Sequence, residues 1–239
     1  MNQGYIKFEE GLEQLNIVIN QDQKDKFLQY YELLIEWNKV MNLTTITDFV
    51  EVINKHFLDS LALVKIYNLT NEKIIDIGTG AGFPGIPIKI AFPNTKIVLL
   101  DSLNKRINFL NEVINSLKLD EITTIHGRAE DCGKDRNYRE QFDICASRAV
   151  ANLTTLSEYC LPFVKTGGSF LSYKSGDITE EILFSKKAIG LLGGSIKEIQ
   201  KFQLPGTDIE RSLIKIIKET KTPMKYPRIA GKPAKEPLL

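Results

Sequence analysis

The sequence predicts an α/β fold: a Rossmann-like, mostly parallel sheet with helices on both faces and a helical extension before it. Three observations support this. The first 70 residues show the three- and four-residue apolar spacing of amphipathic helices. From residue 73 onward, short apolar runs alternate with helical segments, as in a parallel sheet with helical crossovers. A glycine-rich turn, Gly78-Thr79-Gly80-Ala81-Gly82, separates the first run from the next helix.

Apolar stripes predict the helices of the N-terminal extension, residues 1–70. One stripe consists of Phe8, Leu12, Leu15 and Ile19, and a longer one of Phe27, Tyr30, Leu34, Trp37 and Met41. A third short helix is expected to include residues 50–69. These helices precede the first strand, so they form an addition to the sheet domain.

The rest of the chain, residues 71–239, predicts the sheet domain. Apolar, partly β-branched runs indicate parallel strands at 73–77, 96–100, 122–126, 142–147 and 168–173. Helices are expected between them, at 84–92, 104–118, 152–164 and 178–192. Such alternation requires helices on both sheet faces.

The end of the sheet departs from this alternation. Residues 195–203 and 211–218 predict two strands joined by a turn at Pro205-Gly206, so the sheet should finish with a hairpin and one antiparallel strand. That finish is characteristic of seven-stranded methyltransferase sheets and unusual for dehydrogenases. The segment from Thr222 is rich in proline and lysine and is expected to be an irregular, basic loop.

Composition excludes several classes of protein. With 43% hydrophobic and 26% charged residues, the 239-residue chain is an ordinary globular protein, and no apolar run is long enough to cross a membrane. The N-terminus lacks a signal-peptide segment, so a cytoplasmic protein is expected. Two histidines and three widely spaced cysteines offer no metal-ligand cluster, and we predict no metal site.

Charge is distributed unevenly along the chain. Residues 1–72 carry 6 basic and 11 acidic side chains, whereas residues 211–239 carry 8 basic and 2 acidic ones. A basic segment beside a neutral core indicates a polyanionic partner, because clustered Lys and Arg make phosphate contacts. Charge alone equally allows a solvated terminal segment that only aids solubility.

The glycine turn allows two cofactors. Gly80-x-Gly82-x-x-Gly85 satisfies the dinucleotide fingerprint. However, the strand ends at Asp76-Ile77-Gly78, and counted from Gly78 the last fingerprint glycine is replaced by Phe83. An acid at the mouth of the strand, Asp76, would repel a pyrophosphate but attract a cationic amino-acid group. This favours S-adenosylmethionine over NAD; a turn that only connects strand and helix is the structural alternative.

Asp101 closes the second predicted strand. In a wound α/β unit, a carboxylate at this strand tip can accept two hydrogen bonds from a ribose diol. Methyl-donor and dinucleotide sites both use such an acid, so Asp101 supports a nucleoside ligand without choosing between them. Its structural alternative is the N-cap of the helix at 104–118.

The end of the fourth predicted strand bears on the methyl acceptor. It reads Ser147-Arg148 and lacks the Asn/Asp-Pro-Pro-aromatic and Pro-Cys motifs that assist methylation of exocyclic amines and pyrimidine carbons. An acceptor that is already a good nucleophile, such as a purine ring nitrogen, fits this absence. Arg148 would donate to a guanine edge or to the donor's carboxylate; a plain surface arginine is the alternative.

Two further segments could serve the cofactor. The loop at residues 126–131 abuts the tip of the second strand, so its backbone and one acid, with Glu130 preferred by position, could contact the donor's adenine. His56 and Asp59 lie three apart on one face of the third helix. Such a pair is commonly a structural contact, but here it could close a lid over the cofactor.

With these residues in view, the chain resembles the glucose-inhibited division protein B family of small-subunit rRNA (guanine-N7) methyltransferases. The resemblance covers almost the whole length. It is carried by Asn42-Leu43-Thr44, His56 with Asp59, Asp76 through Pro87, Arg128-Ala129-Glu130, Ser147-Arg148-Ala149, Lys174 to Gly176 and Tyr226-Pro227-Arg228 with Gly231.

The resemblance implies a class I S-adenosylmethionine-dependent methyltransferase that modifies N7 of guanine 527 in the 530 loop of 16S rRNA, near the decoding centre. The family's loss is associated with weak streptomycin resistance. Gly78, Phe83, Ala129, Glu130 and Arg148 would contact S-adenosylmethionine. The RNA would meet a basic cleft formed by Arg128, Arg148, Lys174 and Arg211.

We therefore predict a methyltransferase that binds its donor through Asp76, Gly78, Gly80, Gly82, Phe83, Asp101, Ala129, Glu130 and Arg148, with no general base, because the attacking lone pair carries no proton. The partner would be 16S rRNA or the small ribosomal subunit, and the enzyme a monomer without membrane contact. Three alternatives remain: a methyltransferase of small molecules or proteins, an NAD-dependent oxidoreductase, and a non-catalytic RNA-binding protein.

Overall fold

The computed structural model describes residues 2–148 and 150–238; Met1, Ala149 and Leu239 lie outside the described residues, and with them the last position of the Ser147-Arg148-Ala149 motif. The chain begins with helices α1 (Asn2–Gln14) and α2 (Gln21–Met41). A capping box at Asn20 starts α2, since its side chain accepts from the Gln23 N–H and the Gln23 side chain accepts in return. The two predicted apolar stripes of these helices face the protein interior.

The third predicted helix is present but not uniform. It consists of α3 (Phe49–Val52), the π-helical turn η1 (Ile53–Leu58), α4 (Asp59–Leu61) and the 3-10 turn η2 (Ala62–Lys65). It ends four residues before the predicted end at 69. Turns of the π type are rare and are frequently found at functional sites.

The predicted sheet is confirmed. Its strands are β1 (Lys73–Ile77), β2 (Lys96–Asp101), β3 (Ile122–His126), β4 (Phe142–Arg148), β5 (Val164–Ser175), β6 (Gly194–Gln203) and β7 (Glu210–Lys218). Their order is β3-β2-β1-β4-β5-β7-β6, and β7 runs antiparallel to both of its neighbours. The hairpin predicted around Pro205-Gly206 therefore closes one edge of the sheet.

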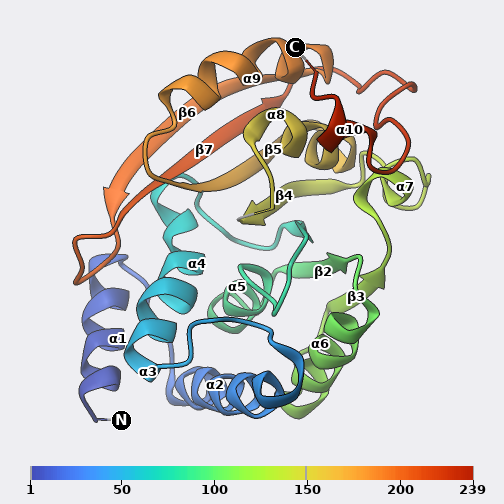
Figure 1. Cartoon of the computed structure of the whole chain (residues 1–239). Helices are drawn as coiled ribbons and strands as arrows, with labels where there is room; N and C mark the ends of the chain where they lie inside the picture. Colours follow the sequence, from blue (N-terminus) through green and yellow to red (C-terminus); the bar gives the residue numbers. More distant parts are fainter. Residues whose placement is uncertain (1, 149, 239) are drawn as a thin grey trace.

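Helices cover both faces of the sheet (Figure 1). On one face lie α5 (Gly85–Ala91) and α6 (Asn104–Ser116) together with α2, and on the other α8 (Leu153–Cys160) and α9 (Thr179–Leu191). The short helices are α7 (Ala129–Cys132), the 3-10 turn η3 (Leu161–Phe163) and α10 (Lys232–Lys235). The predicted helix at 152–164 tightens at Pro162, which has no N–H to continue it.

Two apolar cores result from this layering. Alternation along β1 sends Ile74 into one core and Ile75 and Ile77 into the other. The first core also contains side chains of α1, α2 and η1, so the N-terminal helices share it with the sheet. The boundary at residue 70 thus marks a change of secondary structure within continuous packing, and two-domain organisation remains a prediction.

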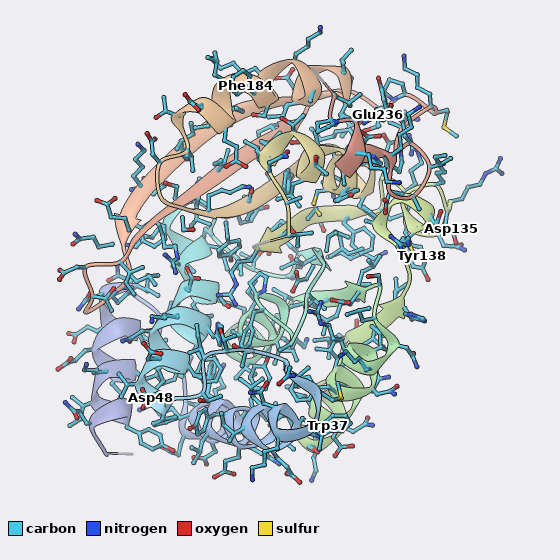
Figure 2. The ribbon with its side chains drawn as sticks, in the orientation of Figure 1. Trp37, Asp48, Asp135, Tyr138, Phe184 and Glu236 are labelled. Carbon is cyan, nitrogen blue, oxygen red and sulfur yellow. The ribbon has the colours of Figure 1, made fainter. Side chains whose placement is uncertain are left out.

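Figure 2 shows Trp37 near the meeting of α2 and α6, where its ring centroid lies 5.7 Å from that of Phe109. In the part of the chain that the structure describes, no helix is long and apolar enough to cross a membrane.

The C-terminal segment is more ordered than its predicted irregular loop. It forms one helical turn, α10, and buried groups tether it to the sheet domain. Arg139 donates to the carbonyl groups of Thr222 and Tyr226, and Arg228 pairs bidentately with the buried carboxylate of Glu158. These contacts hold the segment against α8.

Candidate active site

A cavity of about 820 Å³ opens at the carboxyl ends of β1, β2, β4 and β5. The strand order reverses between β1 and β4, and ligands of open α/β sheets bind at such a switch point. The volume is that of an ordinary ligand pocket, about 300–1,000 Å³. Segments from all parts of the chain line it: Leu43, Thr44, Ile46, Lys55, His56, Asp59, Gly78 to Ala81, Phe83, Asp101, Ser102, Arg106, Arg148, Val150 to Asn152, Tyr173 to Ser175, Glu181 and Arg211.

The glycine turn supplies one wall of the cavity. Gly80 has φ +62°, and a Cβ atom there would have no protein atom closer than 4.0 Å, so the bare backbone borders open space. Gly82 faces the other way: at φ +99°, an added Cβ would lie 2.5 Å from Ile86 and 2.7 Å from the Tyr30 hydroxyl. Gly80 therefore offers bare backbone to a ligand, whereas Gly82 allows close packing against α2. Gly78 also lines the cavity, but an added Cβ atom there would lie 2.6 Å from the Val150 side chain.

Asp76 lies beneath the turn, not at the mouth of the strand, which corrects the predicted position. Its carboxylate is fully buried and does not line the cavity. Oδ2 accepts from the Thr79 hydroxyl at 2.6 Å and from the Gly85 N–H at 2.9 Å, so it braces both ends of the turn. Oδ1 has no partner among the described residues. Burial raises the pKa of Asp76 from 3.8 to about 6.

Asp101 reaches the cavity from the tip of β2, as predicted, but its oxygens already have partners. Oδ2 accepts from the Gly80 N–H at 2.9 Å and from Arg106 Nη1 at 3.1 Å, and Oδ1 accepts from the Leu103 N–H. Leu103, not Asp101, is the N-cap of α6. The carboxylate thus ties the glycine turn to β2, and a ribose diol would have to share it with the partly exposed Arg106.

Two arginines meet at one carboxylate in the wall of the cavity; we call Asp59, Arg148 and Arg211 the arginine hub. Asp59 Oδ2 accepts from Arg148 Nη1 at 2.8 Å, and Oδ1 accepts from Arg211 Nε at 3.2 Å. The Asp59 side chain is only 5% exposed. The hub joins α4 to the end of β4 and the start of β7.

His56 and Phe83 form an aromatic wall beside the hub. Their rings stack with centroids 4.5 Å apart, and the Arg148 guanidinium lies 5.2 Å from the centre of the Phe83 ring. Burial, followed by the positive charge of Arg148, lowers the pKa of His56 from 6.5 to about 3, so the imidazole is neutral near pH 7. Its Nδ1 lies 3.1 Å from the Lys55 carbonyl oxygen and 3.2 Å from Arg148 Nη2, and its Nε2 lies 2.9 Å from Thr44 Oγ1. These contacts make His56 part of a fixed wall.

Lys174 also lines the cavity, but its charge is paired. Its Nζ donates to Glu181 Oε1 at 2.6 Å and to the Ala151 carbonyl at 2.7 Å. Five basic and three acidic side chains line the cavity, so the wall carries an excess of positive charge: Lys55, Arg106, Arg148, Lys174 and Arg211 against Asp59, Asp101 and Glu181.

Besides Asp76 and Gly82, three predicted site residues lie outside the cavity lining: Arg128, Ala129 and Glu130. Arg128 is exposed before α7. Glu130 is buried, and its Oε1 accepts from the Gly231 N–H at 2.7 Å. This hydrogen bond gives the buried carboxylate a partner and anchors the C-terminal segment. A contact between Glu130 and the donor's adenine stays a prediction.

Four of the eight basic side chains in residues 211–239 are paired with an acid or buried. Arg211 and Arg228 are paired with buried acids, Lys232 pairs with Glu236, and Lys218 is buried beside Thr222. The net charge of this segment therefore overstates the positive surface that it presents.

Sequence reasoning missed four residues that shape the site. The Tyr30 hydroxyl donates to the Ala81 carbonyl beneath the turn, and the Tyr173 hydroxyl donates to the Ser60 carbonyl at 2.7 Å. Arg106 covers Asp101, and Thr44 orients His56. Only Thr44, within the Asn42-Leu43-Thr44 motif, carried a sequence signal; the others depend on tertiary contacts.

Comparisons with known proteins identify a family. Residues 23–214 match the family model GidB, described as rRNA small subunit methyltransferase G. The ribosomal RNA small subunit methyltransferase G of Lachnoclostridium phytofermentans is 55% identical over 97% of this chain and 96% of its own length. The protein of that name from Acetivibrio thermocellus is 54% identical over 96% of this chain and 94% of its own length.

Solved structures share the fold at low sequence identity. A SAM-dependent methyltransferase from Aquifex aeolicus is 15% identical, with a TM-score of 0.54 over 74% of this chain and 97% of the other. M. jannaschii TYW2, solved in complex with AdoMet, is 17% identical, with a TM-score of 0.50 over 64% of this chain and 71% of the other. These likenesses confirm the predicted methyltransferase fold.

Proposed function

This chain belongs to the rRNA small subunit methyltransferase G family, and we propose that it methylates N7 of one guanine in 16S rRNA. Membership makes the chain an S-adenosylmethionine-dependent methyltransferase of small-subunit ribosomal RNA. The acceptor atom and the nucleotide, guanine 527 of the 530 loop, are the proposal. The observation that carries it is that the glycine turn and the arginine hub line the same cavity.

The residues present fit the methyl donor. Gly78 and Gly80 line the cavity, and the Gly80 backbone borders open space. Asp101 lies beside them at the strand tip where a ribose-binding acid belongs. Phe83 and His56 give an apolar wall. When bound, S-adenosylmethionine supplies a methyl group on a positively charged sulfur; a nucleophile attacks the methyl carbon in line, and the sulfur is the leaving group.

Gly78, Gly80, Phe83, Asp101 and Arg148 would hold the donor. Asp76 and Gly82 would act from behind the turn, by fixing its shape. Contacts from Ala129 and Glu130 would be made by their backbone, because the Glu130 side chain binds Gly231.

The acceptor side of the cavity suits a purine ring nitrogen. N7 of guanine attacks with an in-plane lone pair that carries no proton, so the protein need not supply a base. His56 agrees with this, since both ring nitrogens are engaged by Thr44 and Arg148. The protein's task is to hold donor and acceptor in line, and rigid placement of two reactants is a large part of catalysis.

The positive cavity wall favours an RNA acceptor. Arg148 Nε and Arg211 Nη2 make no hydrogen bond to other described residues, and both side chains line the cavity. They are available to guanine O6 or to a phosphate. We also propose that the enzyme works as a monomer in the cytoplasm, which sedimentation and fractionation can test.

Methyl transfer to defined RNAs tests the proposal. Purified enzyme would be supplied with tritiated S-adenosylmethionine and with 16S rRNA, 30S particles or 23S rRNA from a strain lacking this modification. We expect label in 16S rRNA or the 30S particle, recovered as N7-methylguanosine, and one new stop at guanine 527 in primer extension after reduction and aniline cleavage.

Three results would contradict the proposal. Label on another atom or nucleotide would refute the acceptor assignment. Transfer to metabolites or proteins but not to RNA would favour the first alternative, and RNA binding without any methyl transfer would favour a non-catalytic protein.

A further inference from the structure

Asp59 is the least exposed member of the arginine hub. Each of its two oxygens accepts a hydrogen bond from one guanidinium. Its side chain is 5% exposed, against 14% for Arg148 and 19% for Arg211. Asp59 also lines the cavity, but both of its oxygens are engaged by the two more exposed guanidinium groups. A group in this position acts on a ligand through the arginines.

Further contacts fix the orientation of Arg148. Its Nη1 also donates to the Lys55 carbonyl at 2.8 Å, and Nη2 lies 3.2 Å from His56 Nδ1. Lys55, His56 and Asp59 all lie in or next to the π-helical turn η1. This turn brings a carbonyl, a ring nitrogen and a carboxylate onto one side of a single guanidinium, which leaves Nε and one Nη2 hydrogen for a ligand.

The charge of the hub matters for the proposed reaction. N7 of guanine is neutral before methylation and its ring is cationic afterwards, so positive charge grows on the acceptor. Two arginines without a counter-charge would oppose that change, although they attract RNA phosphates. One carboxylate between them halves the positive charge of the hub and keeps both donors in place.

We propose that Asp59 is a positioning residue for methyl transfer: it fixes Arg148 and Arg211 in the cavity wall and offsets their charge as the acceptor guanine becomes cationic. This inference rests on the proposed function. It replaces the expectation of a mobile lid, because His56 and Asp59 are buried and hydrogen-bonded on several sides. In this arrangement Arg148 donates to guanine O6, since N7 must keep its lone pair for the methyl group.

The test separates rate from RNA binding. Initial rates of N7-methylguanosine formation would be measured at saturating donor against varied 16S rRNA or 30S particles, for the native enzyme and Asp59→Asn. We expect kcat to fall about tenfold to a hundredfold, while the KM for RNA does not rise. The affinity for RNA should also depend more steeply on salt. The slope of log K against log salt concentration should change by up to about one, because one arginine is freed to bind a phosphate.

A second substitution tests the charge balance. Arg211→Gln in the Asp59→Asn background removes the excess positive charge, and we expect kcat to recover at least about threefold over Asp59→Asn alone, a non-additive result typical of coupled residues. Asp59→Glu keeps the charge and should retain more activity than Asp59→Asn. Glu158→Gln is the matched control: it neutralises a buried, arginine-paired carboxylate outside the cavity and should leave kcat within about twofold per folded molecule.

The inference is overturned if Asp59→Asn keeps kcat within about twofold. It is also overturned by the following combination of results: Asp59→Asn lowers kcat and raises the KM for RNA, Asp59→Glu loses as much activity, and adding Arg211→Gln to Asp59→Asn restores none of it. Circular dichroism at the assay temperature gives the folded fraction for each variant. A native enzyme that forms no N7-methylguanosine would instead refute the proposed function, on which the inference depends.

Discussion

Asp76→Asn tests why the chain keeps a buried carboxylate beneath the glycine turn. Asparagine has nearly the same shape, and its carbonyl oxygen can accept both existing hydrogen bonds, from Thr79 and Gly85. The substitution therefore removes the charge while preserving the brace. The unpartnered Oδ1 becomes an amide nitrogen with no acceptor, which costs about 1–3 kcal/mol.

The magnitude follows from the raised pKa of Asp76. A native value of about 6 against 3.8 means that the folded protein holds this proton more tightly than the unfolded chain, so the ionised form destabilises the fold. The penalty develops as pH rises from about 4 to 6 and reaches about 3 kcal/mol above pH 6, at 1.36 kcal/mol per pH unit. It is lost again as the carboxyl protonates on lowering the pH.

We expect the unfolding free energy of Asp76→Asn relative to the native protein to rise by about 2 kcal/mol between pH 4.5 and 7.5. Urea unfolding at each pH, followed by the fluorescence of the single tryptophan, Trp37, measures it. A stability difference that is constant across this pH range would refute the reasoning.

Three other predictions follow from the site and its supports. Gly82→Ala should lower the unfolding free energy by about 2–4 kcal/mol in urea titrations, because its Cβ atom would overlap two side chains. The control Gly176→Ala, at φ +74° in open space, should lower it by only about 1 kcal/mol, and equal losses would contradict this reasoning. Arg148→Lys keeps the charge but not the fork, so kcat/KM should fall at least about tenfold in initial-rate assays; full activity would show that charge alone suffices. Arg228→Ala strands the buried Glu158 carboxylate and should cost about 3–5 kcal/mol in thermal unfolding, with activity per folded molecule retained; an unchanged Tm would count against an anchored C-terminal segment.

Most of the fold was predictable because the strands and the covering helices each have a characteristic apolar pattern in the sequence. Strands such as β1 are buried on both faces and read as continuous apolar runs, and the hairpin turn at Pro205-Gly206 has its own residue signature. The π-helical turn η1 gave no such signal. Its hydrogen-bond shift depends on tertiary contacts, so the sequence indicated only a regular helix.

The site was predictable as residue types but not as pairings. Asp59, Arg148 and Arg211 were each singled out, yet the pairs they form are 89 and 152 residues apart in the chain. Local patterns do not report such distances. For the same reason, the sequence did not show that Asp76 lies beneath the turn, bound to Thr79 and Gly85, or that Glu130 is bound to the distant Gly231.

The separation between Asp59 and Arg211 also bears on how the active site forms during synthesis. Asp59 leaves the ribosome early, together with the N-terminal helices, whereas Arg211 belongs to the last strand to be made. Until β7 inserts between β5 and β6, Asp59 has at most one of its two guanidinium partners. A chain arrested before that strand could fold its N-terminal helices and first strands but would lack a complete acceptor wall. Activity should therefore appear only after the final hairpin has folded into the sheet.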